Sequence, residues 1–328
     1  MAFNSVSDVL EPKAVSAYFP AELRDRLAFI SSGAATLDLN DLAQIGGDTL
    51  DIRKFQPDDT AAELNNGATS TGAVVGSYRD IAVITRRKRV RGVDDSIHAA
   101  LGTGDADAVN REIARVNGYY WSREMQTSLG KVISAHFDTT SGVLRSTHLN
   151  DISAATGTPK FAGYGAIQDT AKKLADNMDE LSLLLVNNMV WADLKKADAA
   201  KCDIRAIGNG QSAWFYDGLQ VFLTNQLPTS GSGSYIKYLT LLVRPGAFAF
   251  GMQREMQTYY QFNAYSVQEI LTTTLDYCAH VRGVKWVGTA SDGKAGATDT
   301  ELATATNWTK VGAQREIGVA ALLSNASV

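Results

Sequence analysis

Cysteine is scarce in this chain of 328 residues, which contains only Cys202 and Cys278. The two thiols are not closely spaced, and the N-terminal residues do not resemble a secretory leader, because no basic stretch is followed by an apolar run. We therefore expect both cysteines to be reduced, as in a protein kept in the cytosol. Long hydrophobic runs are also missing, and the densest stretches, such as residues 238–243, are far too short to cross a bilayer.

Positive charge is not in surplus either. The chain has 31 Lys and Arg against 35 Asp and Glu, which gives a formal net charge of −4. Electrostatic attachment to a phosphate backbone needs an excess of Lys and Arg. The composition therefore argues against a protein whose overall role is to coat nucleic acid, although a local basic patch remains open.

Motifs of common catalytic sites are missing. The chain has no Gly-x-Ser-x-Gly elbow, no Gly-x-x-x-x-Gly-Lys phosphate loop and no complete Gly-x-Gly-x-x-Gly. The only close pair of metal-ligating residue types is Cys278 with His280, a poorer set than the closely spaced ligands of zinc sites. A core cysteine beside a hydrogen-bonded histidine is the favoured interpretation. We expect no enzyme activity, catalytic residue, metal or cofactor.

What the chain does contain is a long helical segment at residues 108–137, without proline and with an apolar stripe at helical spacing. Thirty residues at about 1.5 Å each give a rod of roughly 45 Å, much longer than the average globular helix of about 11 to 12 residues. Asp107 is the expected N-cap, and Gly118 and Gly130 predict a bend. Such a rod can be the spine of a flat domain.

Two β-rich segments precede this helix, at residues 48–56 and 79–91, and they predict a long two-stranded hairpin. The residues between them, 58–77, are rich in Asn, Gly, Thr and Ser. An isolated two-stranded hairpin is at best marginally stable in water. Since no covering element is evident beside it, we expect another subunit to cover the hairpin.

The second strand of this hairpin carries a dense basic run. Its members are Arg86, Arg87, Lys88, Arg89 and Arg91. Side chains alternate along a strand, so both faces would be basic. A nuclear-import or nucleic-acid patch and a solvated strand face are both open interpretations. Our hypothesis is that these residues meet carboxylates of adjacent subunits and fix their register.

An aromatic group lies in the middle of the predicted long helix, at Tyr119, Tyr120 and Trp121. Three consecutive residues cover too much of the helix circumference to face a single core. We therefore expect part of this group to form an intersubunit contact.

The rest of the chain mixes helical and strand patterns without an internal repeat. Amphipathic or apolar segments predict helices at 166–178 and 189–196, a buried strand at 181–187, and further strands at 217–224, 235–243, 269–287 and 318–323. Residues 1–46 have too few apolar side chains to close a domain of their own, which is typical of an arm. The order is thus an arm, a hairpin, a long helix and a mixed α and β body.

Several local phrases accompany this order. They are Ser32-Gly33, residues 104–107, 119–121, 175–181, 189–195, 217–222, 225–228 and 235–239, Gly246-Ala247 and residues 280–286. Together they resemble the major capsid proteins of tailed phages, which have the Hong Kong 97 fold. The resemblance covers nearly the whole chain. It departs from the family at residues 186–188, where Val-Asn-Asn stands in place of a frequent Met-His-Ser.

The resemblance implies an α+β, Hong Kong 97-like capsid fold with five segments. These are an N-terminal arm at 1–46, a hairpin called the E-loop at 47–94, a peripheral domain at 95–165 with the spine helix 108–137, an axial domain at 166–266, and return strands of the peripheral domain at 267–328.

The resemblance also implies a structural role. The chain would assemble with itself as pentamers and hexamers into the icosahedral head of a tailed phage, around packaged double-stranded DNA. It would be made in the cytoplasm of the host bacterium and reside in the virion, with scaffold, portal and cement proteins as further partners and no membrane. An acidic balance suits an inner wall that binds its genome weakly. The alternatives are a nanocompartment shell of the same fold around a protein cargo, and an unrecognised enzyme.

Overall fold

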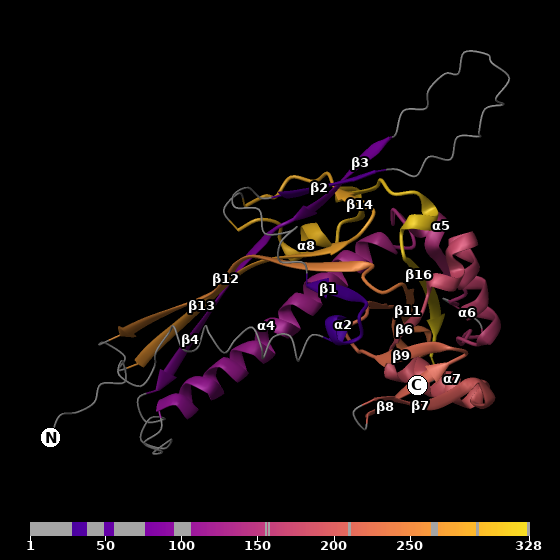
Figure 1. Cartoon of the computed structure of the whole chain (residues 1–328), viewed down its shortest axis with the longest axis horizontal. Coiled ribbons are helices and arrows are strands. Elements are labelled where there is room, and N and C mark those ends of the chain that lie inside the picture. Colours follow the sequence, from indigo (N-terminus) through magenta and orange to yellow (C-terminus); the bar gives the residue numbers. More distant parts are fainter. Residues whose placement is uncertain are drawn as a thin grey trace, which may run out of the picture.

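One long helix and two sheets organise the protein (Figure 1). The computed structural model describes residues 28–37, 49–55, 76–94, 106–154, 156, 158–208, 211–263, 268–292 and 295–326. Most of the expected N-terminal arm and the tip of the expected E-loop, residues 56–75, lie outside the described residues.

The predicted spine helix is confirmed as α4 (Ala106–His136), a single helix of 31 residues. Gly118 and Gly130 both lie inside this continuous helix. Asp107 lies inside the helix, so it is not the N-cap; helix ends are the least certain part of a sequence-based assignment. The predicted apolar stripe faces the core, where Trp121, Met125, Leu129 and Val132 are fully buried.

A four-stranded sheet lies against α4 in the order β1 (Ala35–Leu37), β12 (Phe248–Asn263), β13 (Gln268–Val281) and β4 (Thr85–Asp94). All neighbours are antiparallel except β1 and β12. The indole N–H of Trp121 donates to the hydroxyl of Thr273 on β13 at 3.3 Å, and the hydroxyls of Ser128 and Tyr277 are 2.7 Å apart. Together α4 and this sheet form a long projection from the body (Figure 1).

The expected hairpin is only partly correct. β2 (Thr49–Phe55) pairs with β3 (Ser77–Val83), but the chain leaves this pairing at Ile84 and continues as β4 beside β13. The basic run therefore belongs to β4 and not to the hairpin. The reason is that β13 offers β4 a partner along its full length, in a register of ten residue pairs, whereas β2 has only seven residues.

The base of the hairpin is covered by the chain itself. Leu50 and Ala82 pack with Ile84, Ala249 and Cys278 in a small buried cluster. The expectation that another subunit must cover the hairpin is therefore wrong for its base.

The second sheet has eight strands and forms the centre of the body. Its order is β5 (Leu149–Asp151), β16 (Val319–Asn325), β11 (Lys237–Val243), β6 (Leu183–Val186), β9 (Leu219–Leu223), β8 (Gln211–Tyr216) and β7 (Cys202–Gly208), with β10 (Thr229–Ser230) paired to β11. β6 is buried on both faces, as predicted. Leu183 and Leu185 face the core shared with α4, whereas Leu184 and Val186 face a second core under the helices α6 (Tyr164–Ala171) and α7 (Asn188–Ala197).

Strand pairing differs from the expected segments in two places. β12, expected in the axial segment, pairs with β13 in the sheet on α4. β16, expected among the return strands of the peripheral domain, lies inside the eight-stranded sheet between β11 and β5. The helix expected at 166–178 is divided into α6 and the 3-10 segment η2 (Lys172–Glu180), which contains Ala175 at a φ of 49°.

Short elements complete the described chain. They are α2 (Ala28–Ser31), α5 (Arg145–His148), η3 (Ala199–Lys201), η4 (Gly233–Tyr235), β14 (Val284–Trp286), α8 (Asp299–Leu302), η5 (Ala305–Asn307), β15 (Trp308–Lys310) and η6 (Gln314–Glu316).

Candidate intersubunit surfaces

The basic run lies on β4, which is an edge strand of the sheet on α4. Arg87, Arg89 and Arg91 are paired in register with Leu275, Thr273 and Leu271, whose buried side chains face α4. Because side chains alternate along a strand, Arg86 and Lys88 point to the opposite face. Positive charge therefore lies on both faces, as predicted.

Two arginines on the α4 side, Arg87 and Arg89, have partners within the chain. Arg87 donates from Nη2 to Asp299 Oδ1 at 2.8 Å and to the carbonyl of Ala297 at 3.1 Å. The guanidinium of Arg89 lies over the ring of Tyr120, 3.5 Å from its centre, an attractive cation–π arrangement. These contacts join β4 to α8 and α4, so Arg87 and Arg89 are engaged within the subunit.

Glu124 of α4 lies beside these arginines. Burial, reinforced by repulsion from Asp299, raises the pKa of Glu124 in spite of the attraction of Arg87. Burial also lowers the pKa of Arg91, with repulsion from Arg89. Burial between the sheet and α4 therefore disfavours the charged forms of both side chains.

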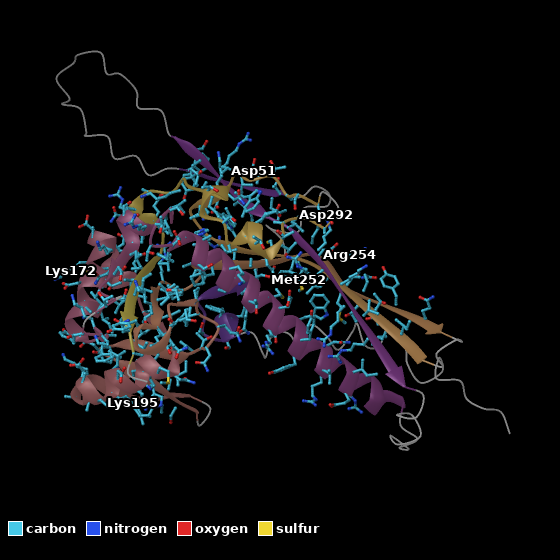
Figure 2. The ribbon with its side chains drawn as sticks, turned by 180° about the vertical axis from the view of Figure 1, so that it is seen from behind. Asp51, Lys172, Lys195, Met252, Arg254 and Asp292 are labelled. Atoms are coloured by element: carbon cyan, nitrogen blue, oxygen red, sulfur yellow. The ribbon has the colours of Figure 1, made fainter. Side chains whose placement is uncertain are left out.

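The opposite face, which we call the outer sheet face, is made by Arg86, Lys88 and Val90 with Arg254 and Tyr259 of β12. Across the adjacent strands β4, β13 and β12, Arg86 is a neighbour of Asp276, which is paired with Arg254. In the same way, Val90 is a neighbour of Thr272, which is paired with Tyr259. Val90 is 56% exposed and Tyr259 52% exposed. Arg254, which Figure 2 shows on the sheet, lies 3.6 Å from the carboxylate of Asp276. A mixed apolar and basic surface of this kind is typical of an interface.

The aromatic group of α4 does not act as one surface. Tyr119 is 59% exposed and remains a candidate contact, whereas Tyr120 is half-buried under Arg89. Trp121 is fully buried and bonded to Thr273, so its expected part in an intersubunit contact is wrong. A rotation of 100° per residue directs three consecutive side chains to three different neighbours.

Sequence reasoning missed a buried charge cluster at the base of the hairpin. Asp80 of β3 accepts a hydrogen bond from His280 Nε2 at 2.5 Å and one from the Gly283 N–H at 2.9 Å, and Lys54 Nζ lies 3.9 Å away. Both Asp80 and His280 are fully buried. Burial by itself would raise the pKa of Asp80, but the attraction and hydrogen bond of His280 together with the Gly283 N–H hold it below its ordinary value.

The Cys278 and His280 pair has no metal-site geometry. His280 bonds to Asp80, while Cys278 lies in the apolar cluster under the hairpin, where burial raises the pKa of its thiol to about 12. Within the described residues, no group of three or more His, Cys, Asp or Glu is placed to hold a metal ion. In the same part of the chain, no helix is both long enough and apolar enough to span a bilayer.

Comparison with known proteins identifies clear relatives in phage heads. No family profile matches the chain. The major capsid protein of Bacillus phage SPP1 is 27% identical over 320 residues, which cover 95% of each chain. Among solved structures, the capsid of Ralstonia phage GP4 has a TM-score of 0.57 at 10% identity and covers 90% of this chain and 88% of its own.

Two further structures agree. The capsid of cyanophage Pam1 has a TM-score of 0.57 at 13% identity, covering 92% of this chain and 93% of its own. The chain of Mycobacterium phage Bobi has a TM-score of 0.52 at 13% identity, covering 92% and 91%. These likenesses cover about nine tenths of the chain or more. The chain therefore has the Hong Kong 97 fold, and its predicted resemblance to the major capsid proteins of tailed phages is confirmed.

Proposed function

We infer that this chain is the major capsid protein of a tailed phage and that its copies build an icosahedral head. The single observation that carries this function is the match to the SPP1 capsid protein along 95% of both chains. A match of that extent relates nearly the whole polypeptide to a capsid subunit.

The shape of the subunit supports assembly. α4 and its sheet project far from the body (Figure 1). Phe55, at the outer end of β2, is 79% exposed. Permanent interfaces often bury about 2,000 to 5,000 Å², and projecting elements supply that area against several neighbours. Repeated head-to-tail contacts close into rings, which would be pentamers and hexamers here.

Finer parts of the function follow from this role. Lys88 on the outer sheet face would meet a carboxylate of a neighbouring subunit, because it is exposed, whereas Arg86 donates to Gln253 and Arg87 and Arg89 are engaged within the chain. The shell would enclose double-stranded DNA without reading its sequence. It would be made in the host cytoplasm and would work with scaffold, portal and cement proteins.

An enzyme is the less favoured function. Two hollows lie along α4. They are lined mainly by hydroxyl and amide side chains, and each contains one cation, Lys131 or Arg123. A catalytic site usually brings together several titratable groups with shifted pKa values. Two of the groups with shifted pKa values, Asp80 and Cys278, are instead enclosed in the core.

The test is to purify the full chain and examine it by negative-stain electron microscopy and size-exclusion light scattering. Regular shells, or stable pentamers and hexamers, are the expected result. Shells that carry a protein cargo and no DNA when isolated from the native source would select the nanocompartment alternative. A monomer that persists at high concentration, and also when the neighbouring phage head genes are co-expressed, would refute the assembly function.

A further inference from the structure

The solvent side of α4 carries a row of positive side chains. Residues four apart on a helix form a continuous ridge that winds slowly around it. One such ridge consists of Arg111, Arg115, Tyr119, Arg123, Thr127 and Lys131, and all four of its cations are exposed. Of the nearby carboxylates, Glu112 pairs with Arg115, and Glu124 lies close to Arg87 under the sheet.

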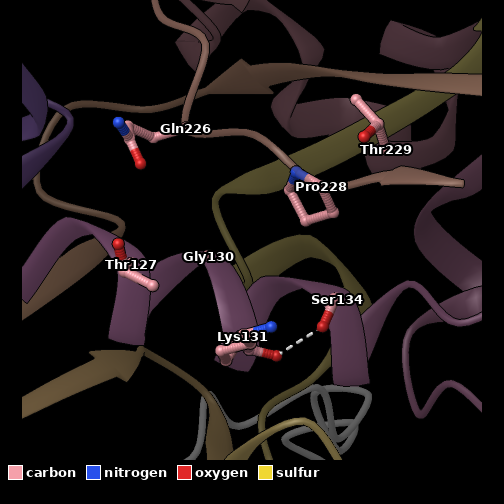
Figure 3. Close-up of a pocket in the computed structure, with 7 residues that line it drawn as sticks. All are labelled: Thr127, Gly130, Lys131, Ser134, Gln226, Pro228 and Thr229. Atoms are coloured by element: carbon pink, nitrogen blue, oxygen red, sulfur yellow. Dashed lines mark hydrogen bonds between the residues drawn. The ribbon is translucent and has the colours of Figure 1, made fainter. Parts of the chain in front are cut away.

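Two hollows open along this ridge, where the segment between β9 and β10 approaches the helix. One is lined by Tyr119, Ser122, Arg123, Gln126 and Gln226, and the other by Thr127, Gly130, Lys131, Ser134, Gln226, Pro228 and Thr229 (Figure 3). Each has a volume of about 340 Å³. The described residues that line them include one cation each and no carboxylate. Gln226 forms a wall of both hollows.

A glycine makes this arrangement possible. A Cβ atom on Gly130 would stand 2.9 Å from the backbone carbonyl of Gln226. Any larger residue would push the segment away from the helix. The close approach lets Gln226 line both hollows.

The chemistry of the hollows suits a chain of phosphates. The hydroxyls of Ser122, Thr127 and Ser134 already donate to carbonyls of their own helix, so the strong donors facing a ligand are the guanidinium of Arg123 and the ammonium of Lys131. Eight residues of helix separate their Cα atoms by about 12 Å. A single small anion cannot bridge that distance, whereas each strand of a DNA duplex presents a phosphate about every 3.4 Å along its axis.

We propose that the face of α4 formed by Arg123, Lys131 and Gln226 binds the phosphate backbone of the packaged double-stranded DNA and therefore lines the interior of the shell. The proposal rests on the proposed capsid function. It replaces the expectation, drawn from the net charge of −4, of an inner wall that binds its genome weakly, because the acidic surplus is not located on this face. Contacts to phosphate position a duplex without reading its sequence.

The test compares two variants of the full chain with equal net charge. Arg123→Gln with Lys131→Gln removes both cations of the hollows. Lys172→Gln with Lys195→Gln removes two exposed cations from the body, where Figure 2 labels them. Binding of a 30-base-pair duplex to the unassembled subunit is measured by fluorescence anisotropy between 50 and 200 mM salt, and shell formation is measured separately by electron microscopy.

Each phosphate contact contributes about −0.9 to the slope of log affinity against log salt. The wild type should therefore lose roughly tenfold more affinity across this salt range than the α4 variant, and the body variant should behave as the wild type. The α4 variant should still form shells.

Three outcomes would overturn the proposal. If the α4 variant forms shells and keeps the wild-type salt slope, DNA does not bind there, and the capsid function stands. If it alone fails to form shells, the face is a contact between subunits, and the capsid function again stands. If the wild type never assembles, the capsid function and the inference that rests on it both fail.

Discussion

The buried pair of Asp80 and His280 should hold the hairpin to the body, and Asp80→Asn is the perturbation that tests it. Asparagine keeps the size of the side chain but removes the charge that faces His280 at 2.5 Å and Lys54 at 3.9 Å. Removing one partner of a fully buried charged pair usually costs about 3 to 5 kcal/mol. Asn can still accept the hydrogen bond from the Gly283 N–H, so we expect the lower end of that range.

The assay is urea and thermal unfolding of the unassembled subunit. For a chain of this length, about 3 kcal/mol corresponds to a fall in Tm of roughly 4 °C. The matched control is Asp51→Asn, the same substitution in the same hairpin, where the carboxylate pairs with Arg79 at 3.4 Å on a part-exposed surface. A surface pair of this kind is worth about 1 kcal/mol or less.

The effect of pH gives a second, independent readout. Because the folded pKa of Asp80 is below its ordinary value, its contribution is fully present above an unfolded pKa of about 3.9 and is lost as the pH falls through the folded pKa. Asp80→Asn should remove this loss below about pH 4. If Asp80→Asn lowers stability no more than Asp51→Asn does, and hydrogen exchange in β2 and β3 is unchanged, the pair does not anchor the hairpin.

Three further predictions address other parts of the subunit. Lys88→Glu should reduce shell yield several-fold without changing Tm, whereas Lys172→Glu should assemble normally; equal yields in microscopy would remove the outer sheet face as a contact. Burial lowers the pKa of His136 to about 3, whereas its unfolded pKa is about 6.5. The folded protein should therefore lose stability as the pH falls from about 6.5 toward 3, because only the unfolded state takes up the proton there. His136→Phe should flatten this part of the curve of stability against pH, and an unchanged curve would contradict this assignment. Gly283 has a φ of 89°, and a Cβ there would lie 2.6 Å from Ile317, so Gly283→Ala should destabilise by more than about 1 kcal/mol in urea titrations; a neutral effect would show that the turn can relax.

The elements that could be predicted from the sequence are those whose pattern repeats locally. α4 keeps its apolar period over 31 residues, and β6 is a continuous apolar run between a polar segment and a helix cap. In both cases neighbours in the sequence determine the burial of the side chains. The sequence also placed positive charge on both faces of β4, because the alternation of a strand does not depend on its partner.

Partners distant in sequence could not be predicted. A strand pattern is the same whether its partner is β2 or β13, so the division between β3 and β4 at Ile84 had no local signal. Asp80 and His280 are 200 positions apart. One signal was available, since Asp80 shares a strand face with the apolar residue Ala82, and a carboxylate in an inward-facing position needs a buried partner.

The two basic surfaces of the projection constrain each other. α4 covers one face of the sheet, and Arg86, Lys88 and Arg254 stand on the opposite face. If α4 faces the DNA, the outer sheet face points away from the DNA, and its cations cannot bind the same phosphates. Arg254 already lies beside the carboxylate of Asp276, so Lys88 is the cation of this face that we expect to meet a carboxylate of a neighbouring subunit. A net charge of −4 is compatible with both contacts, since the basic residues gather on the projection while the surplus of acidic residues lies elsewhere in the chain.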